Sequence, residues 1–91
     1  MERVSKKIYY EGRVQGVGFR YTVRRLASGF EITGSIRNLA DGRVELIVTG
    51  EKNELQEFLI AIRESELAGH IQNEIAEYLN PPQTFKGFQI L

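Results

Sequence analysis

The segment at residues 12–20, GRVQGVGFR, constrains the fold of this chain more than any other stretch. It leads from a pattern typical of a β-strand, through a turn that contains glycine, into a pattern typical of an amphipathic helix. Gly16 and Gly18 permit a positive φ angle or the close approach of a ligand, so backbone N–H groups can converge beside the positive end of the helix. Arg20 falls in the first helical turn, and its planar guanidinium can bind two phosphate or carboxylate oxygens at once. The segment therefore predicts a strand, an anion-binding turn and a helix in succession.

A second segment, residues 34–50, predicts a β-hairpin. One strand pattern ends near Asn38, the pair Asp41-Gly42 is typical of a tight turn, and an alternating pattern begins at Val44. Taken singly, each segment has a plain structural interpretation. Most glycine-containing turns before a helix bind nothing, and an asparagine before Asp-Gly most often helps to form the turn. The two segments in this order are more specific than either one.

Together, the two segments resemble the two signatures of the acylphosphatase family: residues 12–20 are similar to the first and residues 34–50 to the second. Order and spacing agree, and the resemblance extends over nearly the whole chain. It implies an enzyme that hydrolyses the carboxyl–phosphate bond of acyl phosphates to carboxylate and inorganic phosphate. The sequence departs from the family pattern in two places. Ser35 stands where an aromatic side chain is usual, and residues 64–70 replace a connection that is commonly rich in glycine and proline.

The resemblance also implies the site residues. Arg20 would hold the phosphoryl oxygens and Asn38 would position the attacking water, which makes these two the expected catalytic residues. The expected phosphate cradle consists of Gln15, Gly16, Val17, Gly18, Phe19 and Arg20. Hydrophobic periodicity alone does not place Arg20 opposite Asn38, so that geometry follows from the resemblance.

The chemistry of an acyl phosphate suits such a site. Its leaving group is a carboxylate, whose conjugate acid has a pKa of about 4, so it departs without prior protonation. What remains is to hold the phosphoryl charge and to align a water molecule, because the transition state of phosphoryl transfer is loose. Asn38 is neutral and can fix the angle of attack. We therefore expect no metal and no other cofactor, and inorganic phosphate or sulfate should bind as product-like ligands.

Length and charge narrow the remaining possibilities. A chain of 91 residues is enough for one compact domain, here 1–91. Its formal net charge is zero, so we expect neither a nucleic acid nor a membrane as partner. The chain has no cysteine, which excludes a disulfide framework and a cysteine nucleophile. With no apolar run typical of a signal peptide, we expect a cytoplasmic monomer.

The order of the predicted elements is β-α-β-β-α-β, an α+β fold of the ferredoxin-like type. Its mostly antiparallel sheet should carry both helices on one face. The first helix should end near Gly29 in a left-handed cap, and the second should begin at Asn53 as its N-cap. A strand is predicted from Ile71, and residues 87–91 predict an extra edge strand at the C-terminal end.

Two other functions fit parts of the pattern. The first is a non-catalytic module on the same fold, which would bind an anion or an acyl phosphate without turning it over. The second is an RNA-recognition domain, which stacks bases on exposed aromatics of its central strands. Residues 43–49 contain no aromatic side chain, which argues against RNA binding. Turnover of a simple acyl phosphate would separate the enzyme from the binding module.

Overall fold

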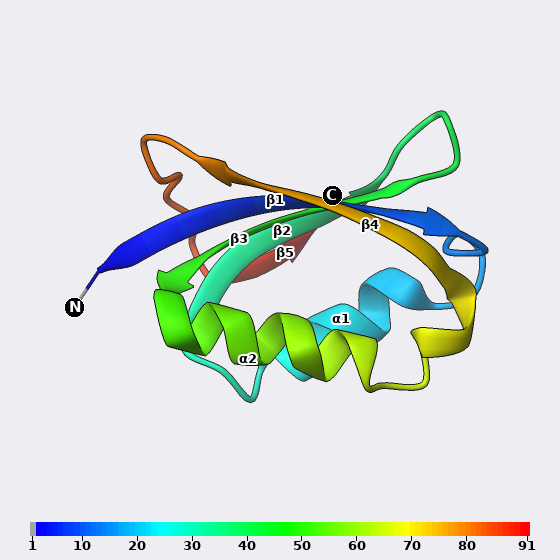
Figure 1. The fold of residues 1–91 in the computed structure, drawn as a ribbon, viewed down its shortest axis with the longest axis horizontal. Coiled ribbons are helices and arrows are strands. Elements are labelled where there is room, and N and C mark those ends of the chain that lie inside the picture. The colour runs from blue at the N-terminus through cyan, green and yellow to red at the C-terminus, as the bar shows by residue number, and fades with distance from the viewer. Residues whose placement is uncertain (1) are drawn as a thin grey trace.

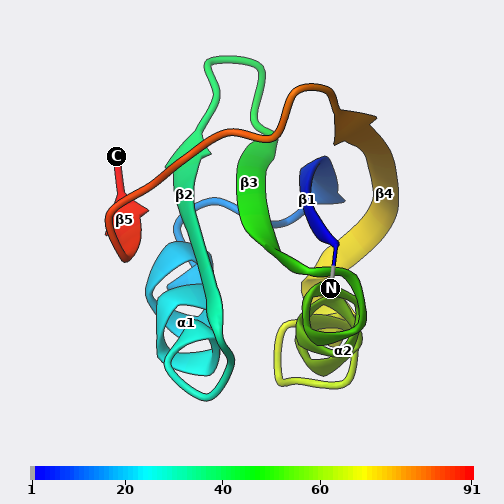
Figure 2. The ribbon, with the colours of Figure 1, turned by 90° about the vertical axis from the view of Figure 1, so that its left-hand side faces the viewer.

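In the computed structural model, which describes residues 2–91, five strands form one sheet and two helices cover one of its faces (Figures 1 and 2). The elements are β1 (Arg3–Gly12), α1 (Phe19–Ala27), β2 (Ile32–Asn38), β3 (Val44–Glu51), α2 (Lys52–Arg63), a 3-10 turn η1 (Ala68–His70), β4 (Ile71–Leu79) and β5 (Phe88–Ile90). This order confirms the ferredoxin-like α+β fold and its extra C-terminal strand. No helix within residues 2–91 is long and apolar enough to cross a membrane.

The strands lie in the order β4-β1-β3-β2-β5, and every pair is antiparallel except β2 with β5. β3 therefore separates β1 from β2, although both of those strands lead toward the predicted site. In the parallel pair Ile36 of β2 is opposite Ile90 of β5. The C-terminal end of the chain thus lies along the outer side of β2.

The core lies between the sheet and the helices, because alternate strand residues turn their side chains to that face. On the central strands these residues are fully buried: Ile8, Tyr10, Val44, Leu46 and Val48. The helices contribute matching apolar stripes, namely Phe19, Val23 and Ala27 from α1 and Leu55, Phe58, Leu59 and Ile62 from α2. The alternation predicted from Val44 and the amphipathic helix predicted after the glycine turn are therefore both confirmed.

Both predicted helix caps were wrong. α2 begins at Lys52, directly after β3, and the Glu51 side chain accepts the N–H of Asn53 at 3.2 Å. The Glu51 carboxylate, at the end of β3, is therefore the N-cap in place of Asn53. Its negative charge also interacts favourably with the positive end of the helix dipole. α1 ends at Ala27, and Ser28 keeps a right-handed conformation with φ of −65°. The Gly29 N–H bonds to the Leu26 carbonyl at 3.0 Å, so the last carbonyls are satisfied without a left-handed glycine.

The segment between β4 and β5 crosses the face of the sheet that the helices leave free (Figure 2). Gln83 fastens it there: its N–H donates to Ser5 Oγ at 2.8 Å, and its carbonyl accepts from Thr49 Oγ1 at 2.8 Å. Ser5 and Thr49 are both buried and lie opposite each other on β1 and β3. This crossing carries the chain from one edge of the sheet to the other, where β5 joins β2.

Candidate active site

The turn that precedes α1 starts from a close approach of two strands. The register of β1 against β4 is irregular between Glu11 and Gly12, and Gly12 has φ of 128°. A Cβ atom at Gly12 would collide with the carbonyl of His70, so only glycine allows this approach. The next N–H, that of Arg13, donates to the same carbonyl at 3.0 Å. The segment 64–70, which departs from the family pattern, thus ends in a turn that contacts the chain at Gly12 and Arg13, just before the predicted cradle.

The turn itself has the backbone that the two glycines predict. Gly16 and Gly18 adopt φ angles of 77° and 76°, in the left-handed region that other residues rarely enter. Among the described residues, no atom beyond the adjacent ones lies within 4 Å of the place where a Cβ would stand on either glycine. Residues 15–18 are exposed, whereas Phe19 is 2% exposed and its ring lies 5.1 Å from that of Tyr10. The turn is therefore anchored at its end and open along its length.

The positive end of α1 faces this turn, and no acidic side chain of the first helical turn neutralises it. Gly18 is the N-cap, no side chain caps the helix, and its first turn contains no acidic residue. The first intrahelical bond runs from the Thr22 N–H to the Gly18 carbonyl at 3.0 Å. The preceding N–H groups have no acceptor within the helix, which is the usual condition of a helix N-terminus. Such groups, with the helix dipole, favour a bound anion.

Gln15 ties the turn to the hairpin between β2 and β3. Its Nε2 donates to the carbonyl of Leu39 at 2.8 Å and to that of Arg43 at 3.0 Å. The hairpin is closed by the Asp41 side chain, which accepts the N–H of Arg43 at 3.1 Å; that bond lowers the pKa of the Asp41 carboxyl. The turn is thus fixed next to Leu39, the neighbour of Asn38. Sequence reasoning did not foresee this role of the Gln15 side chain, because no local pattern signals a contact between residues 24 positions apart.

Arg20 is held beside β2 by Leu91. Its Nη1 donates to the carbonyl of Leu91 at 3.4 Å, and the N–H of Leu91 donates to the carbonyl of Ile36 at 2.9 Å. By contrast, Arg25 and Arg37 form ion pairs with Glu66 at 2.6 Å and with Glu45 at 2.9 Å. Within residues 2–91, no Asp or Glu carboxylate lies within 4.0 Å of Arg20. Most of its donors are therefore available to a ligand.

Asn38 is the last residue of β2 and is not part of the tight turn. Asn38 follows Ile36 by two residues, so both side chains lie on the same face of the sheet, the face that carries the helices. Among the described residues, Asn38 Oδ1 and Tyr10 Oη are the two buried side-chain polar atoms without a hydrogen-bond partner. A buried acceptor without a donor is costly, so this oxygen gains from any donor that reaches it. Ser35 alternates to the opposite face and is 6% exposed, so this departure from the family pattern lies away from Asn38.

The fold thus places three parts of the predicted site in one region. Gln15 holds the glycine turn against Leu39, Arg20 reaches Leu91 beside Ile36, and Asn38 lies between Ile36 and Leu39 in the chain. Tyr10, which lies under Phe19, is fully buried, and this burial raises the pKa of its phenol. Tyr10 therefore stays protonated and serves as packing for the helix. Within residues 2–91, no three His, Cys, Asp or Glu side chains are grouped as a metal site would require.

Comparison with known proteins decides the family. The family model described as acylphosphatase matches residues 6–90. The chain belongs to the acylphosphatase family. It is 34% identical over 89 residues to an acylphosphatase from Thermobifida fusca, and the match covers 98% of both chains. It is 42% identical over 82 residues to an acylphosphatase from Syntrophotalea carbinolica, and that match covers 85% of this chain and 89% of the relative.

Solved structures agree with the sequence relatives. The crystal structure of acylphosphatase from Bacillus subtilis superposes on this acylphosphatase-family chain with a TM-score of 0.87 and 32% sequence identity. The match covers 97% of this chain and 98% of that one. Family membership places the chain among the enzymes that hydrolyse acyl phosphates, as the two signatures predicted.

Proposed function

We propose that this chain hydrolyses acyl phosphates without a metal ion, in a site made by the glycine turn, Arg20 and Asn38. Backbone N–H groups of residues 15–20 and the Arg20 guanidinium bind the phosphoryl group, and Asn38 orients the water that attacks it. The carboxylate leaves unprotonated. All of these groups come from one chain, which is consistent with an enzyme that works as a monomer.

One observation carries this proposal: the contacts of Gln15 and Arg20 converge on the stretch of chain that contains Asn38. The open side of the turn, the uncapped end of α1 and the unpaired Asn38 oxygen then offer donors for an anion and an acceptor for a water. These are the two requirements of an in-line phosphoryl transfer whose transition state is loose. Oriented donors at the phosphoryl group stabilise the charge that spreads over its oxygens.

Asn38 acts on the water by position. Its carbonyl oxygen accepts one water hydrogen and so directs an oxygen lone pair at phosphorus, opposite the leaving carboxylate. The bond from water oxygen to phosphorus forms as the phosphorus–carboxylate bond breaks. The water proton passes to an oxygen of the phosphoryl group itself, which needs no strong base because the transition state demands little nucleophilic push.

The direct test is hydrolysis of a model aryl acyl phosphate, such as benzoyl phosphate, with and without a chelator. We expect full turnover in the presence of the chelator, and poor turnover of phosphate monoesters, whose alkoxide leaving groups are far more basic than a carboxylate. The measurement is the loss of acyl phosphate over time by ultraviolet absorbance. Activity that appears only after a divalent metal is added would contradict the proposal, as would a preference for monoesters.

The same assay addresses the non-catalytic module. A domain that binds acyl phosphates without turning them over would retain benzoyl phosphate intact at stoichiometric enzyme concentration. Family membership favours the enzyme.

A further prediction tests the cradle without catalysis. Inorganic phosphate and sulfate should inhibit competitively and should raise the unfolding midpoint, because they bind only the folded chain. At a hundredfold excess over Kd the gain in unfolding free energy is about 2.7 kcal/mol. Arg20→Ala should remove most of this gain. The comparison is made against chloride at equal ionic strength, and an equal rise in midpoint for wild type and Arg20→Ala would mean that the anion binds elsewhere.

A further inference from the structure

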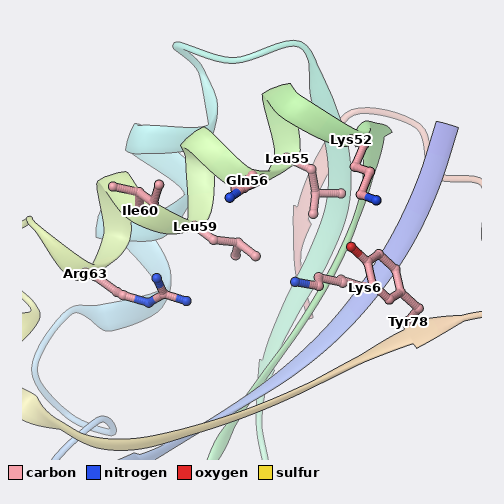
Figure 3. Close-up of a pocket in the computed structure, with 8 residues that line it drawn as sticks. All are labelled: Lys6, Lys52, Leu55, Gln56, Leu59, Ile60, Arg63 and Tyr78. Carbon is pink, nitrogen blue, oxygen red and sulfur yellow. The ribbon is translucent and has the colours of Figure 1, made fainter. Parts of the chain in front are cut away.

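A groove of about 210 Å³ lies between α2 and the strands β1 and β4, and no residue of the candidate active site lines it (Figure 3). Its lining residues are Lys6, Lys52, Leu55, Gln56, Leu59, Ile60, Arg63 and Tyr78. Lys6 lies six residues before Gly12 on β1, so about 20 Å of extended strand separates the groove from the glycine turn. The groove is therefore a separate feature of the molecule.

Positive charge dominates this groove. Figure 3 shows the nitrogen atoms of Lys6, Lys52 and Arg63 directed toward the space between α2 and the sheet. Among the residues that the structure describes, no acidic one is part of the lining. Within residues 2–91, neither Lys6 nor Lys52 has a carboxylate within 4.0 Å. Arg63 does have a partner, since its Nε donates to Glu74 at 2.9 Å, but its two terminal nitrogens remain free for another acceptor.

Three basic side chains thus meet in one groove of a chain whose formal net charge is zero. Elsewhere on the surface Lys7, Arg25, Arg37 and Arg43 each have an acidic side chain within 4.0 Å, whereas the other described Lys and Arg side chains outside the groove have none. Cations gathered in one cavity repel one another, and the cavity walls reduce the screening by water. A bound anion with more than one negative charge would relieve this repulsion.

The floor and rim of the groove are apolar. Leu55 and Leu59 are 2% and 4% exposed and form its base, whereas Ile60 at the rim is 38% exposed. Tyr78 is 53% exposed, and its ring lies 5.0 Å from Lys6 Nζ. Gln56 adds an amide that can donate or accept. An apolar base with a few polar groups around it is typical of sites for small organic ligands.

We propose that this groove is a second binding site, for a small organic polyanion whose acidic groups are attached to a flat apolar body. The acidic groups pair with Lys6, Lys52 and the free nitrogens of Arg63. The apolar body lies on Leu59 and against the Tyr78 ring. A second cavity of about 410 Å³ shares Lys52 and Tyr78 with the groove, but Glu2 lines it, so the acidic groups of the ligand stay in the groove.

Benzene-1,3,5-tricarboxylate is a suitable probe, because it is flat, carries three negative charges and has no bond that this enzyme would hydrolyse. We expect it to shift the backbone amide NMR signals of Lys52, Leu55, Gln56, Leu59 and Ile60. Citrate, which carries three carboxylates without a flat apolar body, should bind more weakly. Arg20→Ala should leave these shifts intact, which separates the groove from anion binding at the glycine turn.

Lys6→Gln combined with Lys52→Gln should raise the Kd of the probe at least tenfold at fixed ionic strength. Lys7→Gln is the matched control: it removes the same charge from the next residue of β1, whose side chain lies on the opposite face, and should leave the Kd unchanged. The double variant should keep its turnover of benzoyl phosphate, since neither lysine belongs to the active site. Equal Kd values for wild type and the double variant would overturn the proposal, as would shifts confined to residues outside the groove or citrate binding as tightly as the probe.

Discussion

Arg20→Lys should lower kcat/KM for an acyl phosphate by on the order of a hundredfold or more, with binding and turnover both impaired. Lysine keeps the charge but loses the planar fork that can hold two phosphoryl oxygens and still reach the Leu91 carbonyl. Folding should survive, because Arg20 is only partly buried and forms no ion pair with an Asp or Glu among the described residues. Steady-state kinetics with benzoyl phosphate and a thermal melt test both statements.

Arg24→Lys provides the matched control for this variant. Arg24 lies one helical turn beyond Arg20 on α1, is exposed, and has its guanidinium 5.4 Å from the Tyr21 ring. The substitution is chemically identical but lies outside the proposed site, so kinetics close to wild type are expected. Near-normal kinetics in a folded Arg20→Lys protein would remove Arg20 from the site. A loss of the same size in Arg24→Lys would show that the effect is not specific to Arg20.

Asn38→Ala should lower kcat by roughly a hundredfold while KM and the inhibition constant of phosphate change little. The reason is the proposed division of roles, in which the turn and Arg20 hold the phosphoryl group and Asn38 acts only on the water. Alanine also removes the buried Oδ1, which has no hydrogen-bond partner among the described residues. Because no hydrogen bond of this oxygen is lost, the free energy of unfolding should not fall. The kinetic effect should therefore appear without a loss of stability.

Asn73→Ala is the control for Asn38→Ala. Asn73 is also a strand asparagine, in β4, but its amide donates to Glu11 at 2.9 Å on an exposed surface. Its removal should leave kcat and KM unchanged. A rise in KM for Asn38→Ala, with kcat intact, would reassign Asn38 to substrate binding or to the structure of the hairpin.

Much of the fold follows from local patterns. Alternating apolar residues such as Ile8 and Tyr10 predicted β1, and helical spacing from Phe19 onward predicted α1, because the side-chain period differs between strand and helix. Both helix caps were predicted wrongly. The N-cap of α2 is Glu51 and not Asn53. The C-cap of α1 is Ser28 in a right-handed conformation, so no left-handed glycine at position 29 is required. Several side chains can serve as a cap, and the exact path of the chain into or out of the helix decides which one does.

The sequence by itself determined the parts of the site that depend on backbone chemistry. Gly16 and Gly18 adopt positive φ because no other residue enters that region as cheaply, and the helix that follows supplies a positive end whatever the rest of the fold does. Their spacing from Arg20, and the second segment with Asn38, carried the resemblance to the acylphosphatase family. These features lie within short stretches of chain, so they can be predicted from the residues alone.

Only the tertiary structure decided how these parts meet. Gln15 contacts a hairpin 24 residues away, and Arg20 contacts Leu91 at a separation of 71 residues. The Arg20 contact requires β5 to lie beside β2, and the crossing segment that leads to β5 is bonded through Gln83 to Ser5 and Thr49. The groove between α2 and β4 likewise gathers Lys6, Lys52 and Arg63 from distant parts of the chain. The free energy of such contacts comes from packing between elements, which local residue patterns do not encode.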